Sequence, residues 1–339
     1  MQLARQAKLI LTYDNIDISE DLAPYQLSVE YTDQSSAKAD DLQITLEDRA
    51  GLWRGDWLPQ KGATLQATIQ TKNWELDGQE ETLPCGTFEI DEIECSGSPD
   101  VVTIKAASVP DSIGLRGVDR TKAWEKTQLT VIAREIAQNA GLELLFESDD
   151  IPEYDRTEQT EQSDLSFLMK LCEDAGLALK ITGTQIVIFD EEKYEQAEPV
   201  MTILKGESWV KSYRITSSTR DVYTACAIKY HDAATNETLE YVFMPPEKAN
   251  TAKTLRINER IDSIAKAEKL AKSKLRQKNK EETKMSLSLI GCTKLVGGVT
   301  VMVEGWGNFD GKYFVTDAKH SISGGYSTSI NIRRCLSGY

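Results

Sequence analysis

Histidine, the side chain that most often moves protons in enzymes, occurs only twice in this sequence, at His231 and His320. Each lies in a segment that we expect to be a strand or a turn. The patterns H-E-x-x-H, G-x-S-x-G and G-x-x-x-x-G-K-[ST], which carry zinc, acyl-transfer and phosphate chemistry, do not occur. We therefore expect both histidines to be structural and the protein not to be an enzyme.

Carboxylate pairs are the machinery of glycoside hydrolysis, and acidic residues are plentiful in this chain. Adjacent acids occur at Asp91 and Glu92 and at Asp149 and Asp150. No surrounding residues identify either pair as a catalytic site, so we expect these side chains to be solvated. A cell-wall hydrolase is the least favoured of the functions considered.

The six cysteines do not form a metal-binding pattern. They lie at positions 85, 95, 172, 226, 292 and 335, without C-x-x-C spacing and without a neighbouring histidine cluster. Free cysteines in a reducing compartment are favoured over disulfides, because the chain is large and no secretion signal is apparent. No metal and no cofactor are expected.

Trp53 and Trp57 flank an Arg54-Gly-Asp triplet and precede Gly62. Such rings stack on sugars in carbohydrate-binding proteins, and they also plug the corners of small β-barrels. Packing is the favoured interpretation, and a peptidoglycan- or carbohydrate-binding module is the alternative. The triplet is too short to indicate an adhesive role.

Alternating apolar and polar residues predict strands in the first 110 residues, at 9–13, 26–31, 42–46, 64–69, 86–93 and 101–106. Several short strands joined by turns indicate a small barrel or sandwich. We expect this first β-barrel domain to span residues 1–114.

The middle of the chain changes character. Apolar residues at helical spacing predict one helix from about residue 127 that ends at Gly141, and a second from Ser163 that ends at Gly176. Strands are expected at 142–146, 177–181 and 185–189. Together they predict an α-β-α-β-β module over residues 115–199.

From residue 200 the pattern returns to strands, at 209–216, 225–231, 238–243 and within 285–335. One long helix, about 262–280, interrupts them, and its narrow apolar stripe comprises Ile264, Ala267, Ala271 and Leu275. Its other faces are rich in Lys and Arg, but we expect a solvated helix packed on a barrel. We therefore predict a second β-barrel domain over residues 200–339.

Two parts of the chain echo each other. The run Gly62-Ala-Thr-Leu resembles Gly298-Val-Thr-Val, and Gly86-Thr-Phe-Glu-Ile resembles Gly311-Lys-Tyr-Phe-Val. Each copy is followed by a turn and an alternating strand. The predicted fold class is thus β-rich α+β, with two related small barrels flanking an α/β module.

Charge and length narrow the function further. The chain has 339 residues and a net charge of −15, which argues against binding of duplex DNA. Residues 141–199 hold 16 acidic against 4 basic side chains. We expect a solvated face, with an acidic rim toward a basic partner or a lumen as the alternative. No apolar run reaches the length of a membrane span, and we expect synthesis in a bacterial cytoplasm without a signal peptide.

Three stretches, taken together, resemble the phage late control protein D family, the hub proteins of contractile tails. The first is DLQITLED from Asp41 to Asp48, which leads to Trp53, Trp57 and Gly62. The second is QSDLSFLMKLCEDAGL at 162–177, preceded by a matching first helix. The third is GWGNFDGKYFVTDAKH at 305–320, followed by GYST.

The resemblance implies a structural role. Such hubs are homotrimers in which each subunit supplies two tail-tube-like barrels, so the ring is pseudo-sixfold and joins a sixfold tail tube to a threefold spike. The implied partners are the tube, spike, tape-measure and neighbouring baseplate proteins of a phage or a headless tail-like particle. Because the chain ends soon after the second β-domain, we expect the spike to be a separate protein.

From the echo and the resemblance we predict eight residues with a structural or interface role: Trp53, Trp57, Gly62, Gly86, Phe88, Gly311, Tyr313 and His320.

Overall fold

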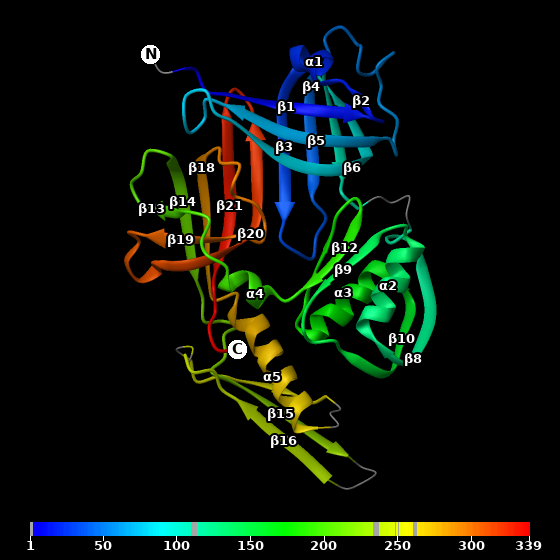
Figure 1. The fold of residues 1–339 in the computed structure, drawn as a ribbon, viewed down its shortest axis with the longest axis vertical. Helices are drawn as coiled ribbons and strands as arrows, with labels where there is room; N and C mark the ends of the chain where they lie inside the picture. Colours follow the sequence, from blue (N-terminus) through cyan, green and yellow to red (C-terminus); the bar gives the residue numbers. More distant parts are fainter. Residues whose placement is uncertain (1–2, 110–113, 233–236, 248, 250, 260–262) are drawn as a thin grey trace.

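The computed structural model describes the chain except residues 1–2, 110–113, 233–236, 248, 250 and 260–262. The described part consists of a first β unit, a middle module, a second β unit, and a three-stranded sheet that carries a long helix (Figure 1). Each part has a cluster of buried apolar side chains. The predicted β-rich class is confirmed.

The first β unit is an antiparallel array in the order β3-β4-β7-β6-β5-β1-β2. Buried and exposed side chains alternate along β3 and β4, since successive residues of a strand point to opposite faces. The short helix α1 (Ser19–Leu22) and a 3₁₀ turn (Ala23–Tyr25) connect β2 to β3. The strands are β1 (Gln6–Tyr13), β2 (Ile16–Asp17), β3 (Gln26–Gln34), β4 (Asp41–Glu47), β5 (Thr64–Lys72), β6 (Glu80–Ser96) and β7 (Val101–Ala107).

The middle module packs two helices, α2 (Leu129–Asn139) and α3 (Asp164–Ala175), against two small sheets. These sheets are the pair β8 (Asp119–Gln128) and β10 (Glu153–Ser163), and the three strands β11 (Ala178–Ile181), β12 (Gln185–Phe189) and β9 (Glu143–Glu147). A short helix, α4 (Glu191–Gln196), follows β12 and leads toward the second β unit (Figure 1). Helix α3 begins at Ser163, whose hydroxyl accepts from the Ser166 amide, and ends at Gly176 in the left-handed conformation. Both predicted helices are confirmed. The pair β8 and β10 was not predicted.

The second β unit has the order β14-β18-β21-β20-β19-β13. The remaining strands form a separate sheet with α5 (Ile264–Asn279), so the predicted long helix packs on this sheet and not on a barrel. The strands of the unit are β13 (Thr202–Leu204), β14 (Val210–Ser217), β18 (Thr283–Ile290), β19 (Thr300–Glu304), β20 (Gly311–Ile322) and β21 (Tyr326–Arg334). The separate sheet contains β15 (Ala225–Asp232), β16 (Glu237–Phe243) and β17 (Thr254–Ile257).

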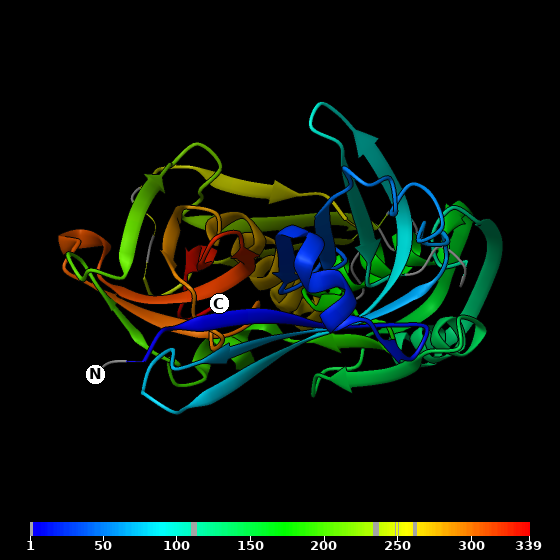
Figure 2. The same ribbon diagram turned by 90° about the horizontal axis from the view of Figure 1, so that it is seen from above.

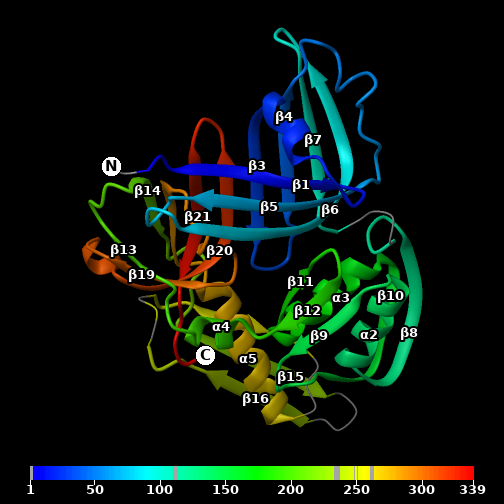
Figure 3. The same cartoon turned by 45° about the horizontal axis from the view of Figure 1, so that its top comes forward.

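The two β units share one 13-stranded sheet because β3 pairs antiparallel with β20. Viewed from above, the second β unit and the middle module lie on opposite sides of the first (Figure 2). Figure 3 shows α5 running beside α3 and α4 of the module. The order of the described strands is open at β14 and at β2, so the two closed barrels expected from the sequence are not confirmed.

Candidate functional site

The sequence echo corresponds to a repeated set of backbone hydrogen bonds. In the first β unit the amide of Gly62 donates to the carbonyl of Ile90 at 2.8 Å, and the Ile90 amide donates to the carbonyl of Ala63 at 3.0 Å. The echo matches these residues to Gly298, Val315 and Val299 in the second unit. There the Gly298 amide donates to the carbonyl of Val315 at 2.9 Å, and the Val315 amide donates to the carbonyl of Val299 at 2.8 Å. The two units therefore share local backbone structure where their sequences are alike.

A β-bulge also repeats. The pairing of β6 with β7 shifts register between Ile90 and Glu92, and the pairing of β20 with β21 shifts between Val315 and Asp317. These are matched positions in the echo. An extra residue at a bulge bends its strand and increases the local twist, so the long strand of each unit bends at the same place.

The predicted positions of the echo have matching environments in the two units. Gly86 and Gly311 both have positive φ, +106° and +140°, which side chains with a Cβ rarely adopt, and Gly62 is likewise positive at +84°. Phe88 and Tyr313 are both fully buried, and the Tyr313 hydroxyl donates to the carbonyl of Phe309 at 2.7 Å. Their role at an interface between subunits stays a prediction.

Trp53 and Trp57 lie together over one end of the first β unit, with ring centroids 5.5 Å apart, and both contact Tyr25. Trp53 is buried in the core and Trp57 is 44% exposed. The Asp48 carboxylate accepts from the Trp53 amide at 2.8 Å and pairs with Arg54, which also pairs with Asp100. The arginine of the triplet thus holds this loop in place.

His320 is fully buried in β20, where its ring stacks between Tyr31 of β3 and Tyr326 of β21. Its Nε2 lies 2.9 Å from the carbonyl of Leu295, which only accepts, so Nε2 carries the proton and Nδ1 accepts from the Tyr326 hydroxyl at 2.7 Å. Burial lowers the pKa of His320 to about 4. The ring is a neutral packing element between the two β units. His231 lies in β15, and its side chain is outside the described part.

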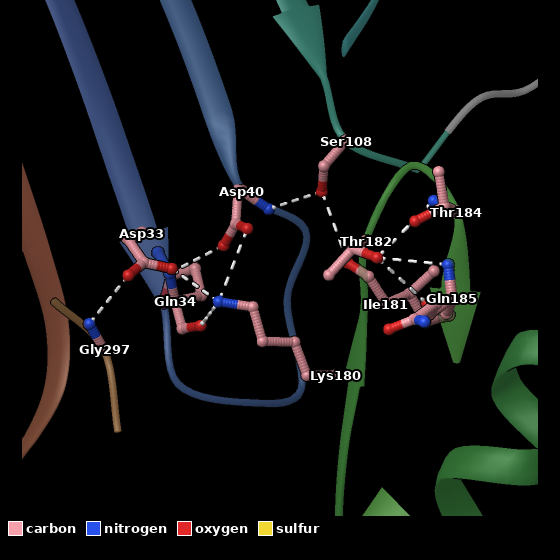
Figure 4. Close-up of polar contacts among 10 residues, drawn as sticks. All are labelled: Asp33, Gln34, Asp40, Ser108, Lys180, Ile181, Thr182, Thr184, Gln185 and Gly297. Atoms are coloured by element: carbon pink, nitrogen blue, oxygen red, sulfur yellow. Dashed lines mark hydrogen bonds and ion pairs between the residues drawn. The ribbon is translucent and has the colours of Figure 1, made fainter. Parts of the chain in front are cut away.

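A buried polar junction joins three parts of the chain (Figure 4). The Lys180 ammonium, from β11 of the module, contacts the Asp33 carboxylate at 2.5 Å, the Gln34 carbonyl at 2.7 Å and the Asp40 carboxylate at 3.4 Å. The other oxygen of Asp33 accepts from the Gly297 amide of the second β unit at 2.9 Å. The first β unit, the module and the second β unit therefore meet at this lysine and its two carboxylates.

Backbone contacts reinforce this polar junction. The Ala37 amide of the β3–β4 loop donates to the carbonyl of Leu179 at 2.9 Å. Ser108 exchanges hydrogen bonds with Asp40 and donates to the carbonyl of Ile181. A Cβ on Gly297 would lie 2.6 Å from the Ser35 amide nitrogen, so only glycine fits there.

Two carboxylates share one ammonium at the polar junction, and one of them titrates abnormally. Burial is the main cause that raises the pKa of Asp40 to about 6, and the Asp33 charge adds to it while Lys180 opposes it. Sequence reasoning missed these three residues. Lys180 offered one signal, a lysine within the otherwise apolar strand Ala178-Leu-Lys-Ile181.

The acidic segment 141–199 finds a basic partner within the same chain. Helix α5 presents Lys269 to Asp150, Lys274 to Asp174 at 2.9 Å and Arg276 to Glu195 at 2.6 Å, and Lys280, directly after the helix, contacts Glu191 at 2.9 Å. This explains both the basic faces of the helix and part of the acidic excess of the module. Whether the other acids face a lumen is untested.

The adjacent acids considered as catalytic pairs lie at the surface. Asp149 and Asp150 are surface residues that pair with Lys193 and Lys269, and Glu92 pairs with Lys105. All six cysteines are free, as predicted. Within the described ranges, no group of three His, Cys, Asp or Glu side chains is placed to hold a metal, and no helix is long and apolar enough to cross a membrane.

Comparisons with known proteins agree with the family indicated by the motifs. The profile of a family described as YQBQ-like matches residues 170–333. A protein of Escherichia phage P2 named probable baseplate hub protein is 29% identical over 229 residues. That match covers 65% of this chain and 55% of the phage protein, so it spans about half the length of this relative.

Solved structures extend the likeness to nearly the whole chain. A tail protein from Neisseria meningitidis has a TM-score of 0.73 at 12% identity, over 97% of this chain and 96% of its own. An Escherichia coli protein described as a type VI secretion component, similar to bacteriophage T4 tail proteins, has a TM-score of 0.60 at 14% identity, over 98% of this chain and 78% of its own. The chain therefore resembles the baseplate hub proteins of phage tails, as its sequence motifs indicated.

Proposed function

We propose that this chain is a structural baseplate hub subunit of a phage tail or a phage-tail-like contractile particle. Three copies form a ring in which six similar β units face a sixfold tail tube, while the threefold symmetry of the ring matches a spike. The observation that carries this proposal is the repeated backbone structure of the two β units. A symmetry adaptor needs two near-equivalent surfaces in each subunit, and the repeat supplies them.

The way the two β units join suggests how the ring closes. Residues 317–322 of β20 pair with β3. The matching part of the first unit is the end of β6, from Glu92 onward, which pairs only with β7 among the described strands. The counterpart of β3 in the second unit is β14, which pairs only with β18 among the described strands. Repeating the β3–β20 geometry between copies pairs β14 of one subunit with β6 of the next and leaves neither edge free.

The registers of the existing strand pairs fix the expected pairing. Within the chain His320 lies opposite Tyr31. By the echo and the strand registers, Cys95 of β6 corresponds to His320, and Ile215 of β14 corresponds to Tyr31. The same pairing between copies therefore places Cys95 opposite Ile215 of the next copy, and Glu94 opposite its Thr216. Cys95 is exposed and Ile215 is half-buried in the isolated chain. The new contact buries both.

A disulfide tests this register directly. Cys95 is an exposed cysteine, and residues directly opposite in neighbouring strands have the Cα separation that a disulfide requires. We expect oxidation of Ile215→Cys to give covalent dimers and trimers. The native mass of the ring should be about 113 kDa, which corresponds to three 37.8-kDa chains. Arg214→Cys, whose side chain points to the other face, is the matched control, and adding Cys95→Ser must abolish the bands. A chain that remains monomeric, with and without a spike protein, would overturn the ring.

The remaining parts of the assignment rest on the resemblance. We propose domains at 1–114, 115–199 and 200–339, with the α5 sheet inserted in the last, and partners among the tube, spike, tape-measure and neighbouring baseplate proteins. The relatives reported above carry structural names, which supports a non-enzymatic role. Recognition of specific DNA sequences is not part of the proposal.

A further inference from the structure

A cavity of about 470 Å³ opens at the end of the first β unit, beneath α1 and the loop that carries Trp53 and Trp57. Its floor is aliphatic, since it is made by the inward side chains of the strands, among them Leu11, Ile44 and Ile104. This volume lies within the range of about 300–1,000 Å³ that is typical of binding pockets. The cavity has no part in the polar junction or in the proposed ring contact.

The mouth of the cavity is apolar and acidic. Trp57 and Leu58 at its rim are 44% and 48% exposed. Asp21 and Asp56 are the charged residues of its lining, which contains no Lys or Arg among the described residues. The adjoining segment 14–21 carries four carboxylates and no basic side chain. Exposed apolar surface beside an excess of negative charge is suited to a basic, apolar partner.

One buried donor in the lining has no acceptor. Trp53 is only 6% exposed, and its indole Nε1 has no hydrogen-bond partner in the folded chain. A buried unpaired N–H costs about 1–3 kcal/mol. That nitrogen has almost no accessible surface, so an occupant of the cavity does not reach it, and recognition depends on the aliphatic floor and the acidic rim.

We propose that this cavity is a docking site for a segment of another protein, which inserts one large apolar side chain between Lys or Arg residues. The aliphatic floor takes the side chain, and the carboxylates of Asp21 and Asp56 attract the flanking cations. A sugar fits less well, because the aliphatic floor would leave most of its hydroxyl groups without partners. The proposal does not depend on the ring.

The experiment uses the full chain labelled with 5-fluorotryptophan, whose fluorine resonances report on each indole separately. Trp57→Phe and Trp53→Phe identify the two resonances. The probes are the amidated peptides KKGFGKK, KKGSGKK and EEGFGEE and a chitin oligosaccharide. We expect KKGFGKK to shift the Trp53 and Trp57 resonances saturably, and the serine and glutamate peptides to bind at least tenfold more weakly.

Charge reversal separates the site from general attraction to an acidic protein. Asp21→Lys with Asp56→Lys is expected to weaken KKGFGKK binding at least tenfold, and Glu207→Lys, on the exposed surface of the second β unit, to leave it unchanged. Circular dichroism checks that the variants fold. Equal binding of KKGSGKK, an unchanged affinity in the double variant, or a saturable shift with the oligosaccharide alone would each overturn the proposal.

Discussion

The joint between the two β units and the joint between the middle module and α5 use different interactions. Six residue pairs of β3 and β20 form the first joint, which encloses the stacked ring of His320. Side-chain ion pairs form much of the second, and cavities of about 350 and 190 Å³ lie along it. Of these ion pairs, Arg276–Glu195 is largely buried and Lys274–Asp174 is partly exposed. Backbone ladders fix both distance and register, whereas partly exposed ion pairs are weak and are screened by salt.

The comparison indicates which parts are rigid and which can shift. The shared sheet is the frame, because moving one β unit against the other breaks backbone hydrogen bonds. The module is held at one side by the polar junction at Lys180 and at the other by α5. Its position therefore depends on a few charges, and changing them tests the comparison.

The largest effect is expected at the polar junction. Lys180→Met keeps the length of the side chain but leaves Asp33 and Asp40 buried without their cation, which should cost about 3–5 kcal/mol of stability at pH 7. Urea unfolding measures this loss. Lys170→Met, on the exposed face of α3, is the control and should change stability by less than about 0.5 kcal/mol. An unchanged Lys180→Met midpoint would mean that the junction does not hold the module.

Proton uptake should act in opposite directions at His320 and Asp40. The pKa of His320 is lowered from 6.5 to about 4, so the unfolded chain binds a proton first as pH falls, and up to about 3 kcal/mol of stability is lost across that window. The pKa of Asp40 is raised from 3.8 to about 6, so the folded chain binds first, and acidification through about pH 6 to 4 adds a similar amount.

Single variants separate these two contributions. His320→Asn should make the protein gain stability on acidification from pH 6.5 to 4.5, relative to its own value at pH 7. Asp40→Asn should make the loss of stability on acidification steeper than in the unmodified chain. Urea midpoints measured at several pH values provide the comparison, and identical pH profiles for the two variants would contradict both assignments.

The smallest effect is expected at α5. Replacing Lys269 and Lys274 by Gln removes two partly exposed ion pairs to the module, each worth about 0.2–1 kcal/mol. Faster amide exchange in α3 should appear at low salt and fade toward about 0.5 M salt, where screening is strong. Lys272→Gln breaks a pair with Glu268 inside α5 and is the matched control. Equal exchange in both variants would show that the ion pairs do not dock the module.

Local patterns predicted much of the fold. Alternation located β1, β3 and β4, and the Ser163 and Gly176 caps located α3, because these signals depend on neighbouring residues. The pair β8 and β10 escaped detection because Trp124 and Gln159 are the only buried residues of the two strands, so alternation is missing. Ile264, predicted to lie on the buried stripe of α5, is 62% exposed, so the stripe begins at Ala267.

The candidate site was harder to predict because its residues meet only through tertiary structure. Lys180 and Asp33 are 147 positions apart, and neither has an unusual local sequence that specifies the other. The echo was visible because both copies carry the same glycines around a bulge. Strand order could not be read from it, since the pairing of β3 with β20 depends on edges that only the assembled units create.

The pairing of β3 with β20 also has a consequence for how the chain is made. Its paired residues lie roughly 290 positions apart, so at about 5–20 residues per second a ribosome needs roughly 15–60 s to deliver β20 after β3. During that interval the nascent first β unit has an unpaired edge. Glu30 and Asp33 lie along it, and such charges discourage contact with other unpaired strands. Aggregation during synthesis is therefore expected to depend on these two acids.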